Sequence, residues 1–127
     1  METILLSNGI TVEVEDKTVL ITGDLYLIHL EISMVADLGE EDEELRRYCG
    51  ENRLRRTRVL KKPAIHARDV DEVKQSMKQS FLATNLPYME HPKFLERFKS
   101  FSLTEFKERE KEEQRIRDLE DRERDLE

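Results

Sequence analysis

Three short turn sequences divide the first 34 residues, and their spacing constrains the fold more than any other feature of the chain. Asn8-Gly9 is typical of a two-residue hairpin turn, because both residues tolerate a positive φ. Gly23-Asp24 places a glycine at the first central position of such a turn, and Asp16-Lys17 is a weaker candidate for a third. Three two-residue turns predict an antiparallel β-meander of four strands over residues 3–35.

One strand register is compatible with all three turns, and it pairs Leu5 with Val12 and Val14 with Val19. The predicted apolar face then collects Leu5, Ile10, Val12, Val14, Val19, Ile21, Tyr26, Ile28, Leu30, Ile32 and Met34. The opposite face is mixed, and among its polar residues it carries Ile4, Leu6, Leu20, Leu25 and Leu27. A shift of one residue would exchange the two faces, so the agreement between separate turns supports the meander.

The rest of the chain predicts a fifth strand and two helices. Residues 53–61 are rich in arginine and fit an edge strand, where charge discourages association between sheets. Asp69 and Glu72 form a capping box that opens a helix over about 69–84, which Leu86-Pro87 ends. A second helix follows over about 92–101. We therefore predict an α+β fold with four to five antiparallel strands packed on two helices, in a single domain over residues 1–103.

The last part of the chain differs in composition from the rest. Residues 105–127 hold 11 acidic and 7 basic residues, with no glycine or proline. Ile116 and Leu119 are spaced as in a coiled coil, but the pattern covers too few heptads to predict one. We predict that residues 104–127 form a charged tail that is helical or partly disordered.

Composition limits the environment and the partners of the protein. The formal net charge is −7, which argues against a protein coated in nucleic acid. A single cysteine, Cys49, excludes an internal disulfide and fits a reducing compartment. The longest nearly apolar run, residues 25–36, is too short to span a bilayer. We expect a cytoplasmic protein that does not bind membranes.

No arrangement of residues in the sequence predicts a catalytic, metal-binding or phosphate-binding site. His29, Glu31 and Ser33 alternate on one predicted strand and share a face, but no nucleophile elbow or glycine-rich loop accompanies them. The three histidines are not spaced as metal ligands, and the four glycines form no phosphate-binding loop. We predict no catalytic, cofactor-binding or metal-binding residues; the sequence leaves open whether the protein is an enzyme, and it points away from one.

Two functional hypotheses follow. The leading one is a non-enzymatic interaction or assembly module that binds itself or an unknown protein, because partly apolar exposed faces often mark interaction sites. Its predicted surface is formed by Ile4, Leu6, Leu20, Leu25 and Leu27. The alternative is a nucleic-acid-binding module that uses the basic segment 46–62, with phosphate contacts from Arg53, Arg55, Arg56 and Arg58. The net negative charge and the acidic segment 37–44 weigh against this alternative.

Overall fold

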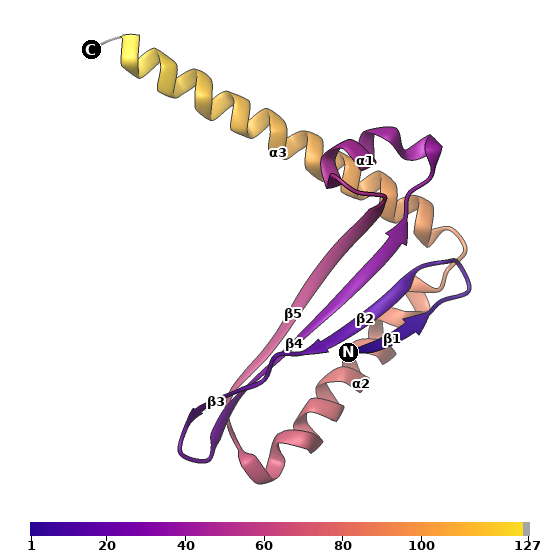
Figure 1. Ribbon diagram of the computed structural model, residues 1–127, viewed down its shortest axis with the longest axis vertical. Coiled ribbons are helices and arrows are strands. Elements are labelled where there is room, and N and C mark those ends of the chain that lie inside the picture. The colour runs from indigo at the N-terminus through magenta and orange to yellow at the C-terminus, as the bar shows by residue number, and fades with distance from the viewer. Residues whose placement is uncertain (126–127) are drawn as a thin grey trace.

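The five strands within residues 1–125 join one antiparallel sheet, and the helices of this part of the chain cover one face of that sheet (Figure 1). The computed structural model describes residues 1–125. The predicted α+β class is therefore confirmed. In chain order the elements are β1 (Glu2–Leu5), β2 (Thr11–Asp16), β3 (Val19–Thr22), β4 (Leu25–Asp37), η1 (Glu40–Asp42), α1 (Glu43–Cys49), β5 (Arg53–His66), η2 (Ala67–Asp69), α2 (Val70–Met89) and α3 (Phe94–Asp125).

The sheet is built on β4, which is 13 residues long. On one side β4 pairs with β5 over its whole length, from Leu25 opposite His66 to Asp37 opposite Arg53. On its other side it pairs with two shorter strands, β2 along residues 30–35 and β3 along residues 25–27. The strands β2 and β3 therefore follow one another along the same edge of β4, and β1 lies beyond β2.

The predicted hairpin at Asp16-Lys17 is wrong. The main-chain N–H of Lys17 donates to the carbonyl of His29 at 2.7 Å, so the chain continues along β4 instead of reversing. Val14 consequently pairs with Ile32 and not with Val19. The physical reason is conformational, since neither Asp16 nor Lys17 adopts the positive φ that such a turn requires.

The hairpin at Asn8-Gly9 is present, but its loop has three residues where two were predicted. The N–H of Leu6 donates to the carbonyl of Ile10, and Gly9 has a φ of 91°. Asn8 fixes the loop, because its Oδ1 accepts from the N–H of Ile10 and its Nδ2 donates to the carbonyl of Met89 at 2.6 Å. The extra loop residue shifts the register by one, so that Val12 faces Ile4 and not Leu5.

This shift exchanges the faces of β1. Leu6 is buried in the core and Ile4 packs against it, whereas Leu5 is 75% exposed. The predicted placement of Ile4 and Leu6 on the second face is therefore wrong, and so is the placement of Leu5 on the core face.

The core consists of two clusters between the sheet and the helices. The first joins buried residues of β2 and β4, such as Val12 and Ile32, to the apolar side of α2, including Phe81 and Leu86. The second lies at the far end of β4 and β5 and brings together Ala36, Leu38, Leu45, Leu54 and Phe98. Stacking of Tyr48 on Phe106 adds a contact between α1 and α3.

The helices are longer than predicted. The prediction that Pro87 ends α2 is wrong by only two residues, since the helix continues to Met89 and the N–H of Glu90 donates to the carbonyl of Leu86 at 2.8 Å. The predicted second helix and the charged tail form one continuous helix, α3, of 32 residues. At 1.5 Å per residue α3 is about 48 Å long, and its C-terminal part projects beyond the sheet (Figure 1). The predicted tail is thus helical from residue 104 to Asp125. Residues 126 and 127 of the predicted tail lie outside the part of the chain that the structure describes.

The register of β1 is tested by two neighbouring leucines. We expect Leu6→Ala to lower the free energy of unfolding by about 2–5 kcal/mol, because it opens a cavity in the core. We expect Leu5→Ala to change it by less than about 0.5 kcal/mol, because that side chain is exposed. Urea denaturation followed by circular dichroism measures both, and the reverse order of the two effects would contradict the register.

Candidate interaction site

The β3–β4 hairpin extends past the core and keeps large apolar side chains in solvent. Val19, Leu20 and Ile21 are 52%, 56% and 52% exposed, and Leu25 is 37% exposed. Neither core cluster contains a residue of β3. Figure 1 shows the hairpin at the end of the sheet farthest from α1. We define the hairpin surface as Val19, Leu20, Ile21, Leu25 and Leu27, whose side chains project from both faces of the hairpin.

Local sequence explains the shape of the hairpin. The predicted turn at Gly23-Asp24 is confirmed, with Gly23 at a φ of 51° and Thr22 paired with Leu25. The register then shifts at Ile21, so that Leu20 faces Tyr26 and Val19 faces Leu27. Such a bulge increases the twist of a strand pair. The turn is tied to the start of η2, because the N–H of Ala67 donates to the carbonyl of Asp24 at 2.8 Å.

The two long edges of the sheet differ in charge. In residues 1–125 the strand β3 pairs only with β4, and its sequence from Val19 to Thr22 contains no charged residue. The strand β5 forms the opposite edge and carries Arg53, Arg55, Arg56, Arg58, Lys61 and Lys62. Charged side chains on an edge strand hinder pairing with another chain. The edge of β3 carries no such charge, and it is limited only by its length of four residues and its bulge at Ile21.

The structure gathers only part of the predicted interaction surface. Leu25 and Leu27 share a face of the hairpin, and Val19 pairs with Leu27 on that face. The predicted placement of Leu20 beside them is wrong, because the bulge at Ile21 pairs Leu20 with Tyr26 on the opposite face. Ile4 and Leu6 belong to the core. Sequence reasoning missed Val19 and Ile21, which alternation assigns to the core face. One signal marks them, namely an uncharged strand with three large apolar residues next to a glycine turn.

Ion pairs within the chain occupy three of the four arginines proposed for nucleic-acid contact. Arg55 pairs with Glu13, Arg56 pairs with Glu105, and Arg53 Nε lies 3.6 Å from Asp37 Oδ1. The guanidinium of Arg58 instead lies 6.0 Å from the centre of the Phe81 ring. Carboxylates beside these arginines reduce the positive potential that phosphates would meet. Binding of nucleic acid by this segment stays a prediction.

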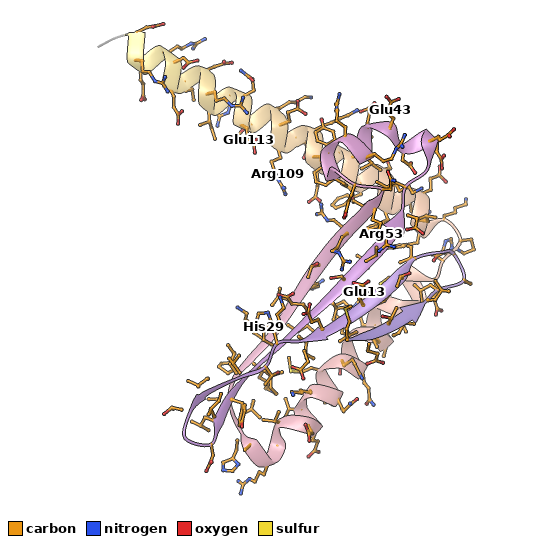
Figure 2. All side chains as sticks on the ribbon, viewed as in Figure 1. Glu13, His29, Glu43, Arg53, Arg109 and Glu113 are labelled. Carbon is orange, nitrogen blue, oxygen red and sulfur yellow. The ribbon has the colours of Figure 1, made fainter. Side chains whose placement is uncertain are left out.

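His29, Glu31 and Ser33 do not form a joint site. The Glu31 carboxylate lies 3.0 Å from Lys17 Nζ and 3.3 Å from His29 Nε2, whereas Ser33 bonds to Thr57 Oγ1 at 2.8 Å. The hydrogen bond from Lys17 lowers the pKa of Glu31, which makes this carboxylate a weaker proton acceptor. Figure 2 shows His29 near the hairpin end of the sheet and Glu13 farther along it.

Among residues 1–125 no three His, Cys, Asp or Glu side chains are grouped so that they could hold a metal ion. Within the same range no helix is long and apolar enough to cross a membrane.

Comparison with known proteins finds no matching family model, curated protein or solved structure.

The pKa of Glu31 tests the Lys17 contact. We expect Lys17→Met to raise this pKa towards its ordinary value of 4.5, because the neighbouring ammonium group is removed. A carbon-detected NMR titration of the Glu31 carboxyl group measures the change. The matched control is Lys78→Met, which removes an ammonium group that pairs with Glu2 and should leave the Glu31 pKa unchanged. Equal effects of the two substitutions would contradict the contact.

Proposed function

We propose that this protein is a non-enzymatic assembly module that pairs with a second copy of itself through the β3–β4 hairpin. The observation that carries the proposal is the character of β3, an edge strand whose four residues are all exposed, three of them large and apolar and none charged. An exposed strand edge has unpaired N–H and C=O groups, which pair readily with another chain unless charge or proline prevents it.

A symmetric dimer would give hydrogen-bond partners to the unpaired N–H and C=O groups along the edge of β3. Two copies of β3 placed antiparallel about a twofold axis would extend the sheet from one protein into the other. No like charges would face each other across that pair, because the strand has none. The same pairing through β5 would oppose arginines and lysines, so β3 is the favoured edge.

The expected dimer is weak, because the hairpin surface offers few apolar side chains to bury. Burying the exposed half of a large apolar side chain contributes on the order of 1 kcal/mol, so Val19, Leu20 and Ile21 from two copies contribute at most about 6 kcal/mol. Association costs about 4–15 kcal/mol in lost freedom of motion. Main-chain hydrogen bonds between the two β3 strands must supply the remainder. The dimer should therefore dissociate on dilution.

The single cysteine and the ion pairs of β5 bear on the cellular compartment and on the nucleic-acid hypothesis. The free thiol of Cys49 is compatible with the reducing cytoplasm, where we place the protein. Nucleic-acid binding ranks below assembly, because Glu13, Asp37 and Glu105 already pair with the arginines that it requires.

The mass of the protein in solution tests the assembly. We expect the full chain, whose monomer is 15.1 kDa, to approach twice that mass at high concentration in light scattering. Leu20→Lys should restore the monomer, because it places a charge on the β3 edge. Leu119→Lys is the matched control; this leucine is 45% exposed on the projecting part of α3, and its replacement should leave the dimer intact.

Two outcomes would overturn the proposal. One is a wild-type protein that stays monomeric at every concentration. The other is a dimer that survives Leu20→Lys and is lost in Leu119→Lys, which would transfer the interface from the hairpin to α3.

A further inference from the structure

A groove of about 610 Å³ runs between β5 and α2. The β5 side consists of residues 58–61, and the α2 side includes Met77 and Phe81. Leu60 and Phe81 also pack against the first core cluster, so the base of the groove is apolar and fixed in place. A volume of this size falls in the range of ligand sites in proteins.

The β5 side of the groove is a free strand edge. Within residues 1–125, β5 pairs with β4 and with no other strand. In an antiparallel edge strand, N–H and C=O groups that face away from the sheet are available to a further strand. An extended peptide bound there would add a strand to the sheet and direct alternate side chains towards α2.

The cations along the groove have no carboxylate partner in the described part of the chain. Arg58, Lys61 and the adjacent Lys62 form no ion pair there, in contrast to Arg53 and Arg56. Arg58 lies over the ring of Phe81, which places a positive charge directly beside the apolar base. The groove therefore combines positive charge, a free strand edge and an apolar hollow.

We propose that this groove binds an extended acidic peptide of another protein. Carboxylates of the peptide would pair with Arg58 and Lys61, and one large apolar side chain would enter between Leu60, Met77 and Phe81. The peptide backbone would pair with β5. This site lies on the opposite edge of the sheet from β3, so the inference goes beyond the proposed self-association and does not depend on it.

Three other roles would each explain only some features of the groove. These roles are protection of the strand edge, pairing with a second copy of β5, and binding of nucleic acid. Protection of the edge would explain the positive charge of β5, but not the apolar hollow beside it. A second copy of β5 would bring arginines and lysines opposite one another, which is unfavourable. A nucleic-acid backbone would pair with the cations but offers no apolar group to fill the space at Met77 and Phe81.

Peptide selection provides the test. A phage library of random decapeptides would be selected on the immobilised full-length protein, and labelled copies of the selected peptides would be measured by fluorescence anisotropy. We expect the peptides to be rich in Asp and Glu around one large apolar residue. The double substitution Arg58→Glu and Lys61→Glu should weaken binding about tenfold or more. The matched charge reversal on α3, Arg115→Glu with Arg117→Glu, should change it by less than about twofold.

The main-chain contact has its own test. Two versions of a selected peptide, methylated at alternate backbone nitrogens, remove one or the other row of N–H donors. One version should lose binding, because a strand pairs through only one of its two rows. The monomeric Leu20→Lys variant should still bind the unmodified peptide. The proposal is overturned by selection of basic peptides or of none, by binding that survives the Arg58 and Lys61 substitutions, or by equal binding of the two methylated peptides.

Discussion

The pairing of β4 along both of its edges is the constraint on which the rest of the structure depends. A buried strand must find partners for the N–H and C=O groups on both sides. The 14 residues of β5 run along one side, with a bulge opposite Leu27, but the six of β2 cover only part of the other. The chain then continues as β3 to cover the remaining end of β4. Because the core clusters use β2 and not β3, that end extends past the core.

Features that depend on residues close together in the sequence could be predicted from it. Alternation of apolar residues and the glycine at position 23 predict the strands and the second hairpin. The helix expected after Asp69 is present as α2, but the predicted capping box is not, because the Asp69 side chain makes no capping hydrogen bond. The register of the first hairpin could not be predicted, because Asn8-Gly9 fits a loop of two residues or of three. In the structure the loop of three residues is accompanied by burial of Leu6 and by the bond from Asn8 to Met89, 81 residues away.

The candidate surfaces depend on contacts between distant residues and were predicted less well. Alternation shows which residues share a face, but it does not show where the helices stop, so it assigns Val19 and Ile21 to the core face. The arginines of β5 are equivalent in the sequence pattern. In the structure they differ, because Glu13 and Glu105 neutralise Arg55 and Arg56 across 42 and 49 residues, while Arg58 contacts Phe81.

The hydrogen bond between Asn8 and Met89 has a consequence for the order of folding. During synthesis the strands of residues 1–37 leave the ribosome long before α2 is complete, and their apolar face has nothing to pack against. The first hairpin gains its last contact only when Met89 has emerged. Contacts between such distant residues slow folding. Most of the chain must therefore be synthesised before its N-terminal strands are stable, and until then they depend on protection from aggregation.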